Sequence, residues 1–481
     1  MSAESILVGL DVGTTGVKAV AITSRGEVVA RTEQEHPFSI PWPGWAEQDP
    51  EDWWRASEEA LAALGVDTVA GIGLAGQMHG LVALDKHERV LRPAILWNDQ
   101  RTAAECAEIE ERVGLAQLIE LTGNRALPGF TAPKLLWLRR NEPSVYERIA
   151  HVLLPKDYVR LRLTGDRAID VADASGTLLF DVAARRWSED VLTALELPVE
   201  WLPRALESPD RSGTTGTGTP VAAGAGDQAA GALGVGVDRP GPVSLVLGTS
   251  GVVFAALPEF VADEEARLHV FCHAVPDMWH AMGVMLSAAG SLRWFRGALA
   301  PGEAHERLLA EAEAWEPGAE GLLFLPYLAG ERTPHADPDA RAAFTGLSLR
   351  HDRGALVRAV LEGVAYGLRD SFELLRGLGV RAAVGRVSGG GARSDLWLRI
   401  VASVLGIPLE RTAVEEGAAF GAALLGGVAG GVFGDVHEAV ERCVRVRDVV
   451  EPDSDWHRIY DEGYERFRAL YPALRPLEAG R

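Results

Sequence analysis

Cysteine is scarce in this sequence, and the three residues present, Cys106, Cys272 and Cys443, lie far apart. No pair has the close spacing of a disulfide-rich module, so we expect packing roles in a reducing cytoplasm. The sequence also lacks an apolar run of about 18 residues and a basic segment followed by an apolar one at its start. These absences predict a cytoplasmic protein with no membrane partner.

Basic residues are in deficit. Lysine and arginine total 47 against 68 aspartates and glutamates, which gives a formal net charge of −21. Because nucleic-acid binding relies on clustered Lys and Arg, this balance argues against a nucleic-acid partner. An anionic small molecule is still compatible if backbone amides and a metal ion supply local positive charge. The 481 residues, 47% of them hydrophobic, are enough for two globular domains.

The most informative stretch is residues 6–20, ILVGLDVGTTGVKAV. Its apolar start predicts a buried strand, and the turn at 13–16, GTTG, predicts a tight hairpin whose glycines allow close backbone approach. Such a turn directs several amide N–H groups and two hydroxyls at one point, which suits a phosphate oxygen. Asp11, just before the turn, suits a cation beside that phosphate. A plain glycine hairpin with a solvated aspartate explains the same residues.

A second copy of this pattern occupies residues 242–257, PVSLVLGTSGVVFAAL. Its turn begins at Gly248, and Val246 stands where the first copy has Asp11. Two such hairpins near the starts of two halves of similar length predict a duplicated domain, with the metal on the first half only. The Arg-Pro-Gly run after Asp238 is the natural boundary. We therefore expect two domains, residues 1–238 and residues 239–481.

Two polar clusters follow predicted strands in the first half. The strand at 68–76 leads into Met78 and His79, and polar side chains at a strand end favour a small-molecule site. A lone histidine is also commonly structural. Asp99 and Arg101 follow another short strand, where they could bind hydroxyl groups or simply cap the next helix.

A glycine-rich segment, VAAGAGDQAAGALGVG, spans residues 221–236. Gly224, Gly226 and Ala229 satisfy a relaxed dinucleotide fingerprint. We reject that interpretation because the segment lies in mid-chain, no acidic residue ends a second strand about 20 residues on, and Asp227 would face a pyrophosphate. Asp227 stands at the mouth of a predicted helix, either as a plain N-cap or as a general base in a crevice.

The second half contains four further features. Residues 384–397, VGRVSGGGARSDLW, predict a strand, a glycine turn and a helix, which is typical of nucleotide sites. Residues 354–376 predict a long amphipathic helix, and residues 416–425 a small-residue helix that permits close approach of another element. Glu331 and Arg332 follow a buried strand, and an ion pair between them is the simplest expectation.

The chain resembles the FGGY carbohydrate kinases over residues 5 to about 470. No single glycine motif would be specific for this family, but the matching segments in this order are specific. The matching segments are DVGTTGVK, GWAEQDPEDWW, GLAGQMHG, RPAILWNDQR, GFTAPKLLW, LLPKDYVRLRLTG, GAGDQAAGALGVG, LGTSGVV, FLPYLAGERTPH, AVLEGVAYGL and SGGGARSDLW.

The resemblance implies a role for each matching residue. Asp227 corresponds to the catalytic base, and Asp11 to the carboxylate that helps to hold Mg²⁺. The implied sugar-binding residues are Met78, His79, Asp99, Arg101 and Asp227. The implied nucleotide-binding residues are Gly13, Thr14, Thr15, Gly248, Thr249, Ser250, Gly390, Gly391, Ala392 and Asp395.

Three positions depart from the family pattern. Gln228 stands where an Asn is expected after the base, so we expect a longer or re-aimed hydrogen bond there. Ala355 stands where a polar residue is expected to start a helix, a loss of about 1 kcal/mol at most. Asp395 stands where some relatives carry an Asn near adenine, which leaves the nucleotide preference less certain than the fold.

The implied fold is α/β, with two duplicated actin/Hsp70-like (ribonuclease H-like) ATPase domains and an active-site cleft between them. The implied reaction is phosphorylation of D-xylulose at O5, with ATP and Mg²⁺ as cofactors. The resemblance also implies that the domains close on the substrates, and it is compatible with a homodimer. Three alternatives stay open: a kinase for another ketose or polyol, a sugar-binding homologue without catalysis, and an assembly or chaperone ATPase.

Overall fold

The computed structural model describes residues 4–414 and 417–478. Each half of the chain contains a seven-stranded mixed sheet. The first sheet has the order β13-β14-β5-β1-β2-β3, with β15 also paired to β5. Its strands are β1 (Ile6–Val12), β2 (Gly16–Thr23), β3 (Val28–Glu35), β5 (Gly71–Gly76), β13 (Arg211–Thr214), β14 (Pro220–Ala222) and β15 (Ala225–Gly226).

The second sheet has the order β18-β19-β17-β16-β22-β23-β24. Its strands are β16 (Pro242–Leu247), β17 (Gly251–Leu257), β18 (His269–Cys272), β19 (Trp279–Met285), β22 (Val384–Ser388), β23 (Leu409–Thr412) and β24 (Val446–Val450). The short strands elsewhere are β4 (Glu47–Gln48), β6 (Val82–Leu84), β7 (Ala94–Ile95), β8 (His151–Leu153), β9 (Ala168–Asp170), β10 (Phe180–Asp181), β11 (Arg186–Trp187), β12 (Arg204–Leu206), β20 (Leu323–Leu325) and β21 (Ala343–Thr345).

The two hairpins occupy equivalent places in their sheets. β1 pairs antiparallel with β2 and parallel with β5, and β16 pairs antiparallel with β17 and parallel with β22. Asp11 lies beside Ala75 of β5, and Val246 lies beside Ser388 of β22. The repeat seen in the sequence is therefore a repeat of sheet topology.

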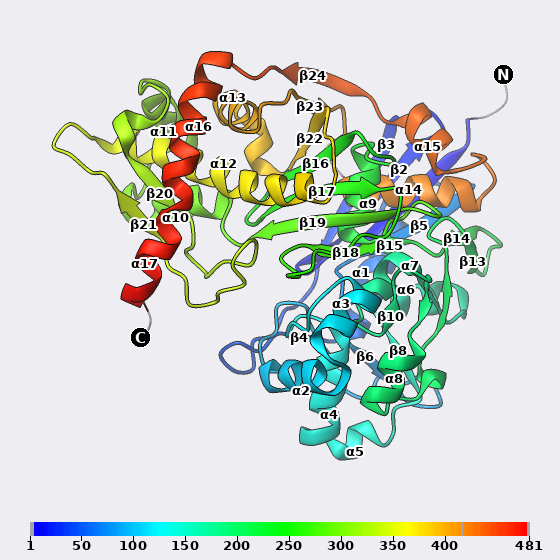
Figure 1. Ribbon diagram of the computed structural model, residues 1–481. Helices are drawn as coiled ribbons and strands as arrows, with labels where there is room; N and C mark the ends of the chain where they lie inside the picture. The colour runs from blue at the N-terminus through cyan, green and yellow to red at the C-terminus, as the bar shows by residue number, and fades with distance from the viewer. Residues whose placement is uncertain (1–3, 415–416, 479–481) are drawn as a thin grey trace.

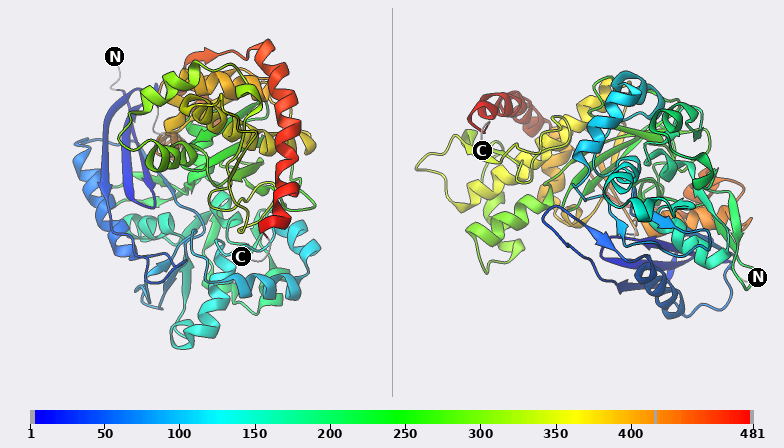
Figure 2. Two further views of the ribbon diagram at one scale, coloured as in Figure 1. Left: turned by 90° about the vertical axis from the view of Figure 1, so that its left-hand side faces the viewer. Right: turned by 90° about the horizontal axis from the view of Figure 1, so that it is seen from below.

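Helices cover both sheets and form a lobe on the first half. In Figure 1, α2, α3, α4, α5 and α8 gather at the lower end, away from β16 and β17. In Figure 2, β1 to β3 (blue) and α16 with α17 (red) lie on opposite sides of the molecule. The first-half helices are α1 (Pro50–Ala63), α2 (Ala103–Val113), α3 (Leu115–Thr122), α4 (Thr131–Asn141), α5 (Pro143–Tyr146), α6 (Pro155–Thr164), α7 (Val171–Ser175), α8 (Glu189–Leu195) and α9 (Asp227–Gly234).

The expected amphipathic helix is α12, which is buried along most of its length. Asp352 caps it by accepting a hydrogen bond from the Ala355 amide at 3.1 Å, so the alanine at 355 leaves the cap intact. The second-half helices are α10 (Ala289–Leu299), α11 (His305–Glu313), α12 (Arg353–Gly377), α13 (Asp395–Leu405), α14 (Gly417–Ala429), α15 (Val436–Cys443), α16 (Ser454–Arg468) and α17 (Leu470–Glu478).

The small-residue helix α14 packs against the first sheet although in the chain it lies between β23 and β24 of the second (Figure 1). A Cβ at Gly73 of β5 would lie 1.7 Å from the Ala422 carbonyl oxygen, and one at Gly421 would lie 1.8 Å from that of Ala230 in α9. The expected close approach is confirmed from Gly417 onward; Glu416 lies outside the described residues. The domain boundary at residue 238 stays a prediction.

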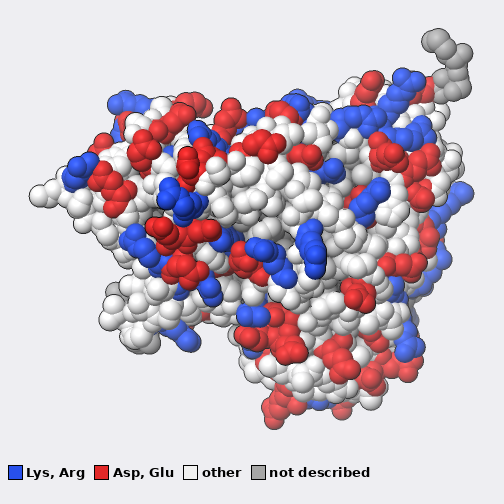
Figure 3. Space-filling model, turned by 45° about the horizontal axis from the view of Figure 1, so that its top comes forward, with Lys and Arg blue, Asp and Glu red and all other residues white. Residues whose placement is uncertain are grey.

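Charged residues are spread over the surface, whereas the cysteines are buried. Lys and Arg alternate with Asp and Glu across the face shown in Figure 3. All three cysteines are buried free thiols. Among the described residues, no helix is long and apolar enough to cross a membrane.

Candidate active site

Side chains from three segments brace the first hairpin. Gln48 donates to the Thr14 carbonyl oxygen at 2.7 Å, Gln77 contacts the Thr14 hydroxyl at 3.3 Å, and the Trp97 indole donates to that hydroxyl at 3.0 Å. Within the described residues, the Thr14 and Thr15 amides donate no hydrogen bond. The turn is thus held rigidly with backbone donors available for an anion.

Asp11 and Asp227 come together at the end of the first sheet. Asp11 on β1 and Ala225 on β15 both lie beside Ala75 of β5, and Asp227 follows β15 as the first residue of α9. Both side chains are partly buried. Burial raises the pKa of Asp11 to about 6. Burial, and then the negative charge of Asp11, raise the pKa of Asp227 to about 7.

The site around Asp11 fits a hard cation. Its Oδ1 atom is buried and has no hydrogen-bond partner in the described part of the chain. A cation would satisfy that oxygen and offset the repulsion between the two carboxylates. The position equivalent to Asp11 in the second half is Val246, which offers no ligand.

These pKa shifts predict how stability depends on pH. Unfolded aspartates lose their protons near pH 4, whereas folded Asp11 and Asp227 hold theirs to about 6 and 7. The folded state binds more protons in that interval, so this pair lowers the free energy of unfolding as pH rises from about 4 to about 7. In thermal melts without metal, Asp227→Asn should gain midpoint temperature over wild type across that interval. A constant difference between the two proteins would contradict the shift.

Met78 and His79 follow β5 and lie close to Asp227. A Cβ at Gly226, just before Asp227, would lie 2.8 Å from Met78 Cγ, so that side chain covers the approach to α9. His79 Nδ1 lies 2.6 Å from the Gly176 carbonyl oxygen. Burial lowers the pKa of His79 to about 3, so the ring is neutral. Because a carbonyl only accepts, Nδ1 carries the proton and Nε2 is left as an acceptor for a hydroxyl group.

Lys134 holds His79 in an uncommon backbone conformation, with φ 68°. The buried Lys134 ammonium donates to the carbonyl oxygens of His79 at 2.8 Å and Gly129 at 2.7 Å, and the Thr131 hydroxyl also donates to His79. The sequence analysis did not single out this lysine. Its signal was a charged residue among the apolar residues of α4.

Asp99 and Arg101, expected near the sugar, are bonded to each other. Asp99 is buried and accepts from the Arg101 guanidinium at 2.7 Å and from the Ala46 amide at 2.7 Å. Arg101 also pairs with Glu47 at 2.8 Å and stacks over Trp45 at 3.6 Å. Both side chains thus fix the tryptophan-containing loop, and their contact with a sugar stays a prediction.

The second hairpin is braced by the start of α10. The amides of Ala288 and Gly290 donate to the Thr249 carbonyl oxygen at 2.9 and 3.1 Å, and Ala289 donates to Gly248 at 2.8 Å. Arg293 of α10 donates to the Thr249 hydroxyl at 2.5 Å. The positively charged guanidinium of Arg293 therefore lies at this turn. Ser250 is the third residue of the turn.

The glycine turn after β22 opens on a cavity of about 170 Å³. Its lining includes Gly390, Ala392, Arg411 and Thr412, while Gly391 is buried beneath it. The helix expected from residue 393 begins at Asp395, after a short 3-10 turn. Asp395 is exposed and pairs with Arg411 at 2.7 Å, so the structure links this residue to the cavity wall.

The predicted ion pair between Glu331 and Arg332 does not form, so that prediction is wrong. Glu331 Oε1 accepts hydrogen bonds from the backbone amides of Leu286 at 2.9 Å and Arg332 at 2.7 Å. Burial raises the pKa of the Glu331 carboxyl to about 8. These amides bind one oxygen of the carboxyl, while Oε2 is buried without a hydrogen-bond partner in the described part of the chain, and no ion pair forms with Arg332.

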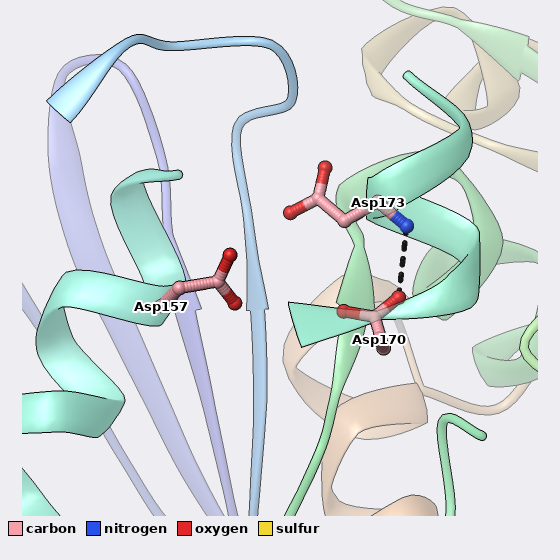
Figure 4. A group of neighbouring side chains, drawn as sticks. All are labelled: Asp157, Asp170 and Asp173. Carbon is pink, nitrogen blue, oxygen red and sulfur yellow. Dashed lines mark hydrogen bonds between the residues drawn. The ribbon is translucent and has the colours of Figure 1, made fainter. Parts of the chain in front are cut away.

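Three buried aspartates that lie close together, Asp157, Asp170 and Asp173, belong to an ionic cluster (Figure 4). The Lys156 ammonium contacts the carboxylates of Asp157 at 2.6 Å, Asp170 at 2.6 Å and Asp173 at 2.9 Å, and Arg160 also pairs with Asp157. All five side chains are fully buried. A Cβ at Gly76 would lie 3.0 Å from Lys156 Cβ, which places the cluster against the end of β5.

The cluster connects to His79 through the chain. Asp170 caps α7 by accepting from the Asp173 amide at 2.9 Å, and α7 leads directly to Gly176, whose carbonyl accepts from His79. The three carboxylates lie near enough to share an ion, yet the Lys156 ammonium occupies that position.

Known proteins match this chain along nearly its whole length. The family models for the N-terminal and C-terminal domains of the FGGY family of carbohydrate kinases match residues 6–234 and 243–430. The xylulose kinase of Escherichia coli is 44% identical, covering 98% of this chain and 100% of that protein, and that of Bacillus subtilis is 38% identical over 98% and 97%. The crystal structure of the Brucella ovis kinase titled a xyloylose kinase has a TM-score of 0.92 at 41% identity, covering 98% of this chain and 100% of that one.

Proposed function

The chain belongs to the FGGY family of carbohydrate kinases, and from this premise we propose that it phosphorylates D-xylulose at O5. ATP is the cosubstrate of this kinase family, and the fold is the two-domain α/β fold of actin/Hsp70-like ATPases. The observation that carries the proposal is the pair Asp11 and Asp227, which meet at the end of the first sheet beside Met78. The choice of xylulose as the sugar rests on the relatives that are named xylulose kinases.

Asp227 is the proposed general base. Its carboxylate accepts the proton of the sugar O5 hydroxyl as that oxygen attacks the γ-phosphorus of ATP and the bond to the β-phosphate oxygen breaks. Its position at the start of α9 places it next to Met78, so the attacking hydroxyl is held on a partly dry surface. The neutral His79 accepts a hydrogen bond from another sugar hydroxyl.

The remaining residues position the phosphates. The free amides of Thr14 and Thr15, and the hairpin at 248–250, suit the β- and γ-phosphates. Gly390, Gly391 and Ala392 suit the nucleoside, beside the cavity near Arg411. Asp11 would hold Mg²⁺, which neutralises charge on the phosphoryl oxygens when bound. Because the two hairpins belong to different halves, we propose that the halves, 1–238 and 239–481, close on the substrates.

Replacing Asp11 with Asn should raise the Mg²⁺ concentration needed for half-maximal ADP formation. The neutral amide removes one anionic ligand while keeping the shape of the side chain. The measurement is an Mg²⁺ titration at saturating ATP and sugar. Val246→Asn, at the equivalent place in the second half, is the matched control and should leave the titration unchanged. An identical titration for wild type and Asp11→Asn would contradict the assignment.

A substrate panel tests the proposed function. We expect ADP release, followed with a coupled assay, to have the highest kcat/KM with D-xylulose among D-xylulose, L-ribulose, xylitol and glycerol. A higher value with another member would move the proposal to a sibling kinase. Absence of any sugar-stimulated ADP release would reject a sugar kinase altogether.

A further inference from the structure

The loop that carries Arg332 is fixed to the edge of the second sheet. The Thr333 amide donates to the Val284 carbonyl oxygen at 3.0 Å, and the Val284 amide donates to the Thr333 hydroxyl at 3.0 Å. The same hydroxyl donates to the Arg267 carbonyl oxygen at 3.0 Å, just before β18. Arg332 is therefore held rigidly beside the first residue of β18, His269.

The Arg332 side chain has no partner of its own. In residues 4–414 and 417–478, its guanidinium forms no hydrogen bond and no ion pair, and Glu331 is bonded to backbone amides instead. The side chain is partly buried, and this burial lowers the pKa of the guanidinium, although the charge of the neighbouring Glu331 opposes that shift. Removing a cation from water without a hydrogen-bond partner costs free energy. A guanidinium whose five N–H donors bind no protein group therefore favours a ligand.

The loop of Arg332 lies beside a wall of aromatic rings that leads to His79. The ring of His269 lies 5.9 Å from that of Phe130, and Phe130 lies 4.8 Å from His79, so these rings form a continuous wall between β18 and the end of β5. The positive charge of Arg332 lowers the pKa of both His269 and His79, in addition to the larger effect of burial. The bonds of Thr333 to Val284 and Arg267 place the Arg332 loop at the β18 end of this wall, which leads to His79.

We propose that Arg332 donates hydrogen bonds to an oxygen of the bound sugar, at the end remote from the hydroxyl that is phosphorylated. The proposal rests on the proposed function. It pairs an arginine donor from the second half with the His79 acceptor from the first, so that one neutral polyhydroxylated ligand satisfies both. Sugar binding would then draw together the half that holds the sugar and the half that carries the nucleotide.

The test compares Arg332→Gln with Arg332→Lys. For Arg332→Gln, KM for D-xylulose should rise roughly 10- to 100-fold, because a charged hydrogen bond is lost, and KM for ATP should change less than about twofold. Arg332→Lys should recover part of the sugar affinity. D-xylulose binding without nucleotide, followed by tryptophan fluorescence, should weaken in parallel. Arg350→Gln, which changes an exposed arginine paired with Glu320, is the control and should behave as wild type.

Three outcomes would overturn the proposal. One is an unchanged KM for D-xylulose in Arg332→Gln. Another is a raised KM for ATP with intact sugar binding, which would assign Arg332 to the phosphates. The last is efficient wild-type phosphorylation of D-gluconate that Arg332→Gln alone abolishes, which would assign it to a carboxylate. A wild-type protein inactive with every sugar would instead reject the proposed function.

Discussion

Replacing Asp227 with Asn should lower kcat by about 10²- to 10⁴-fold while D-xylulose still binds. The amide keeps the size of the side chain and removes the only group at the start of α9 that can take the hydroxyl proton. Asp11, a neighbouring carboxyl, is the proposed ligand of the cation. The loss should therefore appear in kcat rather than in the affinity for sugar. Single-turnover ADP formation and fluorescence-monitored sugar binding measure the two separately.

The stability of the same variant shows whether a loss of activity comes from a loss of folding. Asp227 is destabilising near neutral pH because burial and Asp11 disfavour its charged form. Asp227→Asn should therefore melt at or above the wild-type temperature at about pH 8, with a gain on the order of 2 kcal/mol. A variant that is inactive, folded and no less stable identifies a chemical role. Near-normal turnover would refute it.

Lys156→Met should have the largest effect on stability. The ammonium is fully buried and contacts three buried carboxyl groups, whose charges raise its pKa against the opposing effect of burial. Methionine has a similar length but leaves these carboxyls without their central cation. Removing one partner of a buried ionic group typically costs 3–5 kcal/mol. We expect a marked fall in the thermal midpoint and, where the protein still folds, a raised KM for sugar through displacement of Gly176 and His79.

Two variants serve as controls for the cluster. Arg162→Met alters the same helix, α6, but its partner Glu51 is exposed, so the loss should be within about 1 kcal/mol. Asp173→Asn should also be mild. Burial raises the pKa of Asp173 well above 3.8, so its charged form is disfavoured there, and an amide keeps the size of the side chain. A wild-type melting temperature for Lys156→Met would contradict the role of the ammonium.

Local sequence was sufficient to predict the two hairpins and the place of Asp227. A strand followed by a glycine turn depends on residues close together in the chain, and the second copy distinguished it from an ordinary turn. The continuation of β5 into Met78 and His79 was predictable for the same reason. Their assigned roles come from the family resemblance and stay proposals.

Long-range contacts were not predictable. The ionic cluster joins α6 and α7, and α14 joins the last part of the chain to β5; neither meeting has a local signal. Glu331 and Arg332 illustrate the opposite error. Adjacent residues of opposite charge suggested an ion pair, but the backbone amides of Leu286 and of Arg332 itself bind the Glu331 carboxyl. A loop residue is bonded by whatever surrounds it in space.

Phosphorus NMR of the products formed from D-xylulose and MgATP tests the central claim most directly. The account predicts that wild-type protein forms a sugar 5-phosphate in step with ADP, and that Asp227→Asn forms it at least about 100-fold more slowly. Equal rates for the two proteins would contradict it. So would a wild-type reaction that releases inorganic phosphate without forming a sugar phosphate.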